Sequence, residues 1–275
     1  MSDTIIIEGG RRMKLRRLGE GPPLLCLGGL TQTTANWTSA GRALAELGHG
    51  VLLTDLPGQA GTEPLPSGTP HAQAEVVLGL LDALGLEQID LCGFSYGGRV
   101  ALQAAHRWPE RVRRLVLTST SMGTSPVAAL VVDGWLRAIR SGGLEAMGEV
   151  AMPWIIGEKL LRQVPVEQMV RATVRRNSVE GIESLILGIL HDVAPPVAEL
   201  AMPTLLVAGS HDRFAMAADQ QRLAMSGSGL SCRVFDGLGH TVPVEATLYR
   251  PQSYDDRRGY GRARATRLTH TTAHR

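Results

Sequence analysis

Short apolar runs bounded by turn residues recur along the chain, separated by stretches with the periodicity of amphipathic helices. Six of these runs have the length and character of strands buried on both faces, at 23–27, 51–54, 89–92, 112–117, 204–208 and 231–235. Helical periodicity covers segments between them, at 38–47, 71–84, 99–107 and 216–225. Strands that alternate with helices over short connections form parallel sheets. The pattern therefore predicts an α/β fold with a mostly parallel central sheet and helices on both faces.

This alternation is interrupted in the middle of the chain. Residues 122–200 contain no clear strand and four helical segments, at 127–139, 152–164, 166–176 and 179–190. An all-helical insertion between parallel strands is most simply a cap over the carboxyl edge of the sheet, where ligands bind in such folds. We therefore divide the chain into a core, a helical cap and a tail. The core has two parts, 1–121 and 201–249. The cap is 122–200 and the tail is 250–275.

The positive charge of the chain is concentrated at its carboxyl end. The 275 residues are 44% hydrophobic and 20% charged, with a formal net charge of +2. Residues 250–275 hold seven arginines and two aspartates, a net charge of +5 that leaves −3 for the preceding 249 residues. The body thus lacks the basic surface of a nucleic-acid-binding protein, and we expect no nucleic-acid partner. The arginine-rich tail has no helical periodicity and is predicted to be disordered.

Membrane, secreted and metal-binding classes are not indicated. No apolar run approaches the ~20 residues of a membrane span, and the first residues lack the order of a signal peptide. The three cysteines, Cys26, Cys92 and Cys232, are odd in number and far apart, which argues against a disulfide framework or a zinc cluster. We expect a cytoplasmic globular protein that needs no metal or cofactor. The sequence does not indicate its oligomeric state.

The strongest chemical signal is Gly93-Phe94-Ser95-Tyr96-Gly97, between the strand predicted at 89–92 and the helix predicted at 99–107. It matches G-x-S-x-G, a pattern in which the serine occupies a sharp, strained strand-to-helix turn. The glycines two residues to either side let neighbouring chain pass close. The hydroxyl then projects above the sheet near the positive end of the helix, which makes Ser95 the candidate nucleophile.

A serine nucleophile needs a base, and the base needs a carboxylate to orient it. Asp212 and His240 come shortly after the last two predicted strands, so both should lie at the same sheet edge as Ser95. Serine, acid, histidine is also the chain order expected for this architecture. Two plainer interpretations stay open: His240 as an ordinary turn histidine, and Asp212 as the N-cap of the helix at 216–225.

Acyl chemistry also requires N–H donors for the oxyanion that develops on the carbonyl oxygen. The backbone N–H of Tyr96, directly after the nucleophile, is one candidate. The second is expected from the loop after the strand at 23–27, around Gly29 and Leu30. The pair Gly28-Gly29 allows that backbone to approach a substrate closely.

Together these residues resemble the α/β-hydrolase fold superfamily over about residues 4–245. The resemblance is carried by Gly28-Gly29-Leu30 with Trp37, Asp55-Leu56-Pro57-Gly58-Gln59 with Gly61, the turn at Ser95, and the loops of Asp212 and His240. Aligning Trp37 with the tryptophan that often ends the family's first loop places Leu30 at the second oxyanion position. Gly28 stands where many members have histidine, which removes a polar group but no backbone donor.

The segment at 122–200 suggests the substrate. It is largely apolar and contains Trp135 and Trp154, and an apolar lining would suit a fatty-acyl or polyketide chain. With Gly29 and Trp37 of the first loop, these are the expected substrate contacts, although the cap aromatics could equally pack the cap onto the core. Arginines of the cap could face an acidic carrier protein or coenzyme A, but a solvated helix face is the simpler interpretation.

These observations predict a serine hydrolase that cleaves an ester or thioester of a small hydrophobic acyl substrate through an acyl-enzyme on Ser95. One alternative is an acyltransferase that joins hydroxyacyl chains from a carrier protein or coenzyme A. It rests on a similarity of segments 30–37, 55–57, 209–212 and 218–220 to the acyltransferase of rhamnolipid synthesis. Another is a lyase, a cyclase or a binding module on the same fold, against which the complete set of Ser95, Asp212 and His240 argues.

Overall fold

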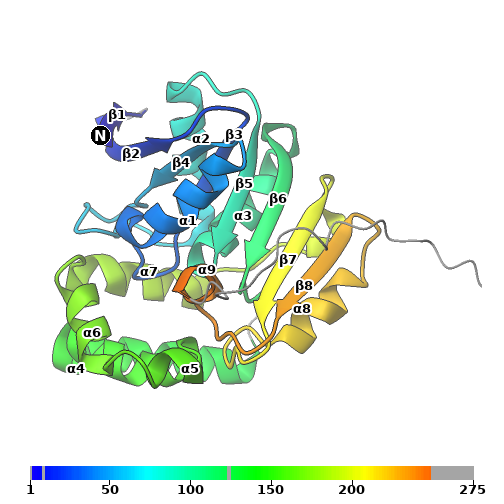
Figure 1. Ribbon diagram of the computed structural model, residues 1–275. Coiled ribbons are helices and arrows are strands. Elements are labelled where there is room, and N and C mark those ends of the chain that lie inside the picture. Colours follow the sequence, from blue (N-terminus) through cyan, green and yellow to red (C-terminus); the bar gives the residue numbers. More distant parts are fainter. Residues whose placement is uncertain (1, 8–9, 123–124, 249–275) are drawn as a thin grey trace, which may run out of the picture.

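A single eight-stranded sheet forms the centre of the molecule in the computed structural model, which describes residues 2–7, 10–122 and 125–248 (Figure 1). The strand order is β1-β2-β4-β3-β5-β6-β7-β8. The strands are β1 Ser2–Ile6, β2 Arg12–Leu18, β3 Pro23–Leu27, β4 Gly50–Thr54, β5 Ile89–Phe94, β6 Val112–Thr118, β7 Thr204–Gly209 and β8 Leu230–Phe235. Strands β3 to β8 are parallel and β1 and β2 antiparallel, which confirms the mostly parallel sheet.

Both faces of the sheet are covered by helices, and strand β3 shows why its sequence is apolar throughout. Leu24 and Cys26 point into a cluster with Trp37 of α1 (Thr34–Glu46). Leu25 and Leu27 point into the main core with helices α2 (Pro70–Ala83) and α3 (Tyr96–Arg107). Successive side chains of a strand face opposite sides, so a strand buried on both sides cannot alternate polar and apolar residues.

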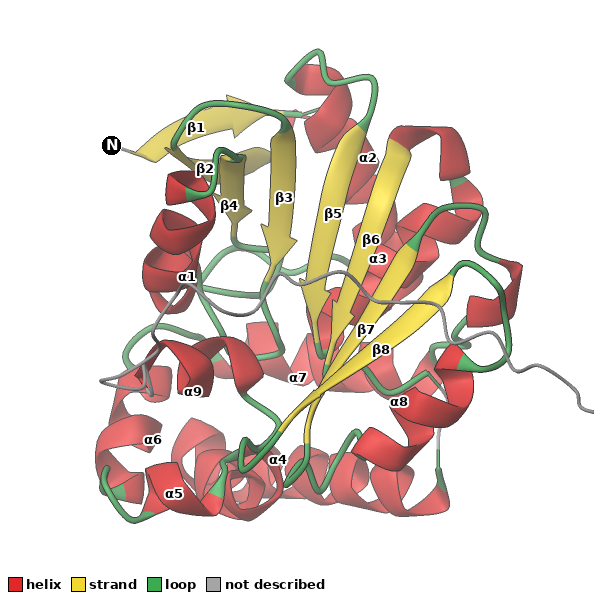
Figure 2. Ribbon diagram, turned by 45° about the vertical axis from the view of Figure 1, so that its right-hand side comes forward, coloured by secondary structure: helices red, strands yellow, loops and turns green. Residues whose placement is uncertain are grey.

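Four helices lie between β6 and β7, across the carboxyl ends of the strands (Figure 2). They are α4 Pro126–Ile155, α5 Glu158–Leu161, α6 Val166–Val174 and α7 Val179–His191. We call residues 126–191 the cap. Helix α4 packs against α6 and α7 and is kinked at Gly142 and Gly143, where the backbone leaves the helical region. The remaining elements are α8 Ala217–Ala224, α9 Val242–Leu248 and the 3₁₀ turns Pro109–Arg111 and Val197–Glu199.

The expectation of one helix over 152–164 is wrong. Helix α4 continues through Pro153 to Ile155, and Ile156 and Gly157 are extended before α5 begins. The interruption coincides with a long-range contact, because the N–H of Gly157 donates to Glu245 on α9, 3.2 Å away. The tail at 250–275, predicted to be disordered, lies outside the described residues. Within the described part of the chain, no helix combines the length and apolar character needed to cross a bilayer.

Glu245 is a fully buried carboxylate at 0% exposure. Its Oε1 accepts hydrogen bonds from the Gly157 N–H and the Thr241 hydroxyl (3.2 and 2.7 Å), and its Oε2 accepts from the Gly239 N–H (3.0 Å). Three donors replace the water that a carboxylate loses on burial, so the charge can be accommodated. Glu245 thereby connects α9, the chain around His240 and the break between α4 and α5.

An ionic cluster fixes the amino end of the sheet. The register of β5 and β6 shifts by one residue at Ile89 and Asp90, so that Arg113 and Arg114 both reach Asp90. Burial alone would raise the pKa of Asp90, but hydrogen bonds from the two arginines outweigh it and lower the pKa to about 2. The bulge thus turns two consecutive arginines toward one carboxylate.

Asp90→Asn should destabilise the fold by about 1 kcal/mol at pH 7, a modest effect because solvent screens the two partly exposed arginines. The folded-state pKa lies below the unfolded value of about 3.9, so this contribution is complete above pH ~4 and is lost as the pH falls toward 2. Urea unfolding of both proteins at pH 7 and pH 3 measures the difference. A difference that grows on acidification would contradict the assignment. Asp82→Asn, in a more exposed pair with Arg111, should have a smaller effect.

Glu245→Ala should cost about 3 kcal/mol, because two buried backbone N–H groups lose their acceptor and a cavity remains. The measurement is the urea-unfolding free energy, with Glu149→Ala on the exposed face of α4 as the control. Substitution of that exposed carboxylate should change the free energy by less than about 0.5 kcal/mol. A loss below about 1 kcal/mol for Glu245→Ala would show that the three hydrogen bonds are not structurally important.

Candidate active site

Ser95 stands at the turn between β5 and α3 with φ 52° and ψ −113°, a left-handed conformation that a non-glycine residue rarely adopts. The flanking residues Gly93 and Gly97 have to be glycine, because a side chain at either position would collide with neighbouring backbone. A Cβ on Gly93 would lie 2.4 Å from the carbonyl oxygen of Gly97, and one on Gly97 would lie 2.5 Å from the carbonyl oxygens of Leu27 and Gly28. The turn is thus pressed against the end of β3, and the Ser95 side chain is left at the carboxyl edge of the sheet.

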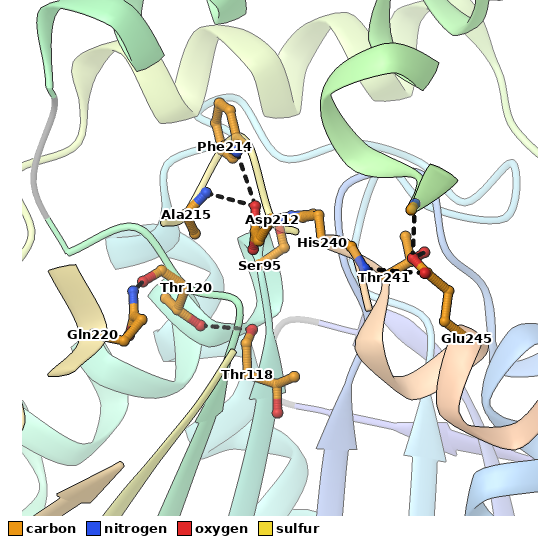
Figure 3. A network of polar contacts seen from close by, with 12 residues as sticks. Ser95, Thr118, Thr120, Asp212, Phe214, Ala215, Gln220, His240, Thr241 and Glu245 are labelled. Atoms are coloured by element: carbon orange, nitrogen blue, oxygen red, sulfur yellow. Dashed lines mark hydrogen bonds and ion pairs between the residues drawn. The ribbon is translucent and has the colours of Figure 1, made fainter. Parts of the chain in front are cut away.

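The three residues predicted to act together do meet in space. His240 Nε2 lies 2.9 Å from Ser95 Oγ, and His240 Nδ1 lies 2.9 Å from Asp212 Oδ2 (Figure 3). Asp212 and His240 are buried, at 5% and 3% exposure. This is the geometry in which an imidazole can accept the serine proton while the carboxylate fixes its tautomer and orientation.

Asp212 does not cap the following helix, because the N-cap of α8 is Met216. Instead its Oδ1 accepts hydrogen bonds from the backbone N–H groups of Phe214 and Ala215, both at 2.8 Å (Figure 3). One carboxylate oxygen is therefore held by the backbone and the other is directed at His240. The two N–H groups satisfy this oxygen in its buried position.

Aromatic rings surround the imidazole. Phe94 lies 5.2 Å from the His240 ring and Phe214 meets it edge-on at 5.4 Å, measured between ring centroids. Trp135 of the cap stacks on Phe214 at 5.2 Å. These rings exclude water from the His240 ring, which strengthens its hydrogen bonds to Ser95 and Asp212.

A pocket opens beside Ser95 under the cap. Its lining is mainly apolar and comprises Leu30, Ser95, Tyr96, Arg99, Ser121, Ala128, Ala129, Val132, Trp135, Ile189, Leu190 and Phe214. Leu30 and Tyr96, the two predicted oxyanion donors, thus flank the same space as the Ser95 hydroxyl. Tyr96 is the first residue of α3, so its N–H belongs to the positive end of that helix.

The loop that carries Leu30 is held by two glutamine side chains. Gln32 Oε1 accepts from the Gly29 N–H at 3.3 Å, and Gln59 Nε2 donates to the Gly29 carbonyl at 2.7 Å. Gln32 is itself held by the indole N–H of Trp37 at 2.8 Å. Both polar groups of Gly29 are therefore engaged, and the backbone beside the pocket is fixed from behind.

The four expected substrate contacts are not placed alike. Trp135 lines the pocket, whereas Trp37 is buried against Phe94 in the core behind the first loop. Trp154 lines a neighbouring groove, with Met122 and Arg213, and not the pocket at Ser95. Gly29 lies directly behind the pocket, where an added Cβ would strike the Phe94 ring at 2.6 Å.

Sequence reasoning did not single out Gln32, Gln59 or Glu245, which position the first loop and the chain around His240. Gln59 belongs to a motif noted above, and Glu245 follows His240 by five residues. The available signal for Glu245 was that it is the one charged residue of the mainly apolar segment 242–248, which indicates a buried carboxylate with polar partners. Nothing in the local sequence reveals that Gln32 reaches Gly29, because glutamines in loops are normally solvated.

Comparison with known proteins identifies the fold. Residues 22–152 match the family model of the alpha/beta hydrolase fold. The chain is 29% identical over 251 residues to 2-hydroxymuconate semialdehyde hydrolase of Pseudomonas putida, covering 87% of this chain and 88% of that protein. It is 26% identical over 248 residues to the polyketide synthase ThaQ of Burkholderia thailandensis, which covers 88% of this chain but only 12% of that protein.

Among solved structures, an esterase from Thermogutta terrifontis superposes with a TM-score of 0.80 at 25% identity, over 90% of this chain and 94% of that one. The enol-lactonase from Burkholderia xenovorans LB400 superposes with a TM-score of 0.79 at 25% identity, over 90% and 96% of the two chains. The sheet order, the strained serine turn and these similarities point the same way. The chain belongs to the α/β-hydrolase fold superfamily and is an enzyme of the hydrolase type.

Proposed function

We propose that this protein is a serine hydrolase that cleaves an ester or thioester of a hydrophobic acyl substrate through an acyl-enzyme. The observation that carries the proposal is the chain of two 2.9 Å hydrogen bonds from Ser95 through His240 to Asp212. It begins at a strained turn that leaves the serine facing a pocket. A structural serine in this fold would need neither the backbone strain nor a buried histidine pointed at its hydroxyl.

In the first half-reaction, His240 Nε2 takes the Ser95 proton while Ser95 Oγ bonds to the carbonyl carbon of the substrate. The carbonyl oxygen becomes an oxyanion, and the backbone N–H groups of Leu30 and Tyr96 stabilise it. The bond from the carbonyl carbon to the leaving oxygen or sulfur then breaks, and the protonated His240 gives its proton to that leaving group. The acyl group stays on Ser95.

In the second half-reaction, water loses a proton to His240 and attacks the acyl carbon, and the oxyanion forms again in the same place. Its collapse breaks the bond to Ser95 Oγ, which regains the proton from His240, and the carboxylic acid leaves. Asp212 remains ionised throughout, since two backbone N–H groups hold one of its oxygens and the imidazolium faces the other.

The apolar pocket supports a hydrophobic acyl chain as the substrate. Its walls come from the first loop, the cap and Phe214, and most of the lining side chains are aliphatic or aromatic. Such a lining favours apolar groups and leaves orientation to a few polar contacts. The names of an esterase and of hydrolases among the similar proteins support hydrolysis as the reaction.

Treatment with a fluorophosphonate should add one adduct to the wild-type protein and none to Ser95→Ala, because only a serine activated by its base reacts. Hydrolysis of p-nitrophenyl hexanoate by Ser95→Ala should fall by about 10⁴-fold or more. Intact-mass analysis and release of p-nitrophenolate measure the two effects. The matched control is Ser226→Ala, an exposed serine after α8.

The control should label and turn over like the wild type. Equal labelling of Ser95→Ala and the wild type, or wild-type turnover by Ser95→Ala, would contradict the proposed nucleophile. Folding of each variant is checked by circular dichroism, so that a lost adduct reports on chemistry and not on unfolding.

A further inference from the structure

One charged side chain stands in the wall of the otherwise apolar pocket. Arg99 lines the pocket together with Ser95 and is only 6% exposed. It lies on α3, four residues after Ser95 in the chain. The proposed mechanism gives this cation no role.

The guanidinium of Arg99 is held in a fixed orientation by Asp192, the residue directly after the cap. Its Nε donates to Asp192 Oδ2 at 2.9 Å, and its Nη2 donates to the same oxygen and to the Asp192 carbonyl at 3.2 Å. Gln103 Nε2 donates to Asp192 Oδ1 at 2.9 Å, so both carboxylate oxygens are in use. Asp192 directly follows α7, the last helix of the cap.

Nη1, the third nitrogen of Arg99, is left over by this arrangement. None of the hydrogen bonds found among the described residues uses it, whereas Nε and Nη2 both donate to Asp192. Among the other polar side chains of the pocket, the Tyr96 hydroxyl donates to the Gly68 carbonyl at 2.7 Å. Nη1 therefore keeps its capacity to donate, and an oxygen on a group that enters the pocket can accept a hydrogen bond from it.

The charges of Arg99 and Asp192 favour a neutral oxygen over a carboxylate as the acceptor at Nη1. Asp192 already neutralises Arg99, and both lie in an apolar surrounding with 8% and 6% exposure. A carboxylate bound at Nη1 would set two anions against one cation in a site with little water, which is unfavourable. A keto or hydroxyl oxygen accepts the same hydrogen bond without adding charge.

We propose that Arg99, oriented by Asp192, is a specificity-determining donor for a neutral oxygen on the acyl chain. Its substrates are then oxo- or hydroxyacyl esters and thioesters in preference to plain acyl ones. This inference rests on the proposed function, because it places the acyl chain in the pocket beside Ser95. It also makes the preference dependent on the end of the cap, because Asp192 directly follows its last helix.

The test compares kcat/KM for N-acetylcysteamine thioesters that share one chain length: hexanoyl, 3-oxohexanoyl, 3-hydroxyhexanoyl, 5-oxohexanoyl and the anionic adipyl monothioester. Thiol release is followed with a chromogenic thiol reagent. The wild type should prefer at least one oxo or hydroxy chain to hexanoyl by about 10-fold or more. A site built to donate a hydrogen bond rejects an analogue that lacks the acceptor.

In the double variant Arg99→Met/Asp192→Asn, the ratio of kcat/KM for the preferred oxo or hydroxy chain to kcat/KM for hexanoyl should fall to about one. This variant removes both charges and so leaves no unpaired carboxylate. If circular dichroism shows that this variant is unfolded, Arg99→Lys takes its place. Lysine keeps the charge facing Asp192 but lacks the guanidinium fork, so the preference should still fall several-fold. The matched control is Arg137→Met, an exposed cap arginine paired with Asp133, which should keep the wild-type preference.

Three results would overturn the inference: a wild type with no preference, a preference that survives loss of the guanidinium, or a wild type that prefers the adipyl substrate. Fluorophosphonate labelling of the same preparations separates this failure from failure of the proposed function. If Ser95 is labelled but the preference does not depend on Arg99, only the role of Arg99 is wrong. If Ser95 in the folded wild type is not labelled, the proposed hydrolase itself is wrong.

Discussion

The close approach of backbone around the Ser95 turn is the constraint on which the rest of the site depends. Gly93 and Gly97 leave no space for a side chain, and Gly98 would place a Cβ 1.9 Å from the Thr120 hydroxyl oxygen. These contacts bring the ends of β3 and β6 against the start of α3. The helix terminus, the first loop and the serine then share one small region, and the strain at Ser95 is sustained by the packing around it.

The other half of the site is held from a distance. His240 lies on a connection after the edge strand β8, and it is positioned by Asp212 on one side and by the contacts of Glu245 around it. Both carboxylates are buried and both accept backbone N–H groups, so each is satisfied without water. The catalytic geometry proposed here is thus supported by two buried anions with different partners.

The sequence was most informative where local pattern and tertiary structure obey the same rule. Apolar runs such as 23–27 predicted strands because both faces of the sheet are buried, and the positions of Ser95, Asp212 and His240 followed from strand ends that meet at one edge. It failed at 152–164, where a contact from Gly157 to Glu245 spans 88 residues. The pair of Arg99 with Asp192 spans 93 residues and leaves no local signature.

The hydrogen bond from Gly157 to Glu245 couples the cap energetically to residues 239–245, which contain His240 and are called the histidine segment below. A displacement of α5 away from the core would remove a donor from the carboxylate that also holds the Gly239 N–H and the Thr241 hydroxyl. A ligand that binds better with α5 in contact with Glu245 therefore also favours the hydrogen bonds that order the histidine segment. By linkage, the ordered segment favours that ligand by the same factor. Substrate recognition and assembly of the reactive site are in this sense reciprocal.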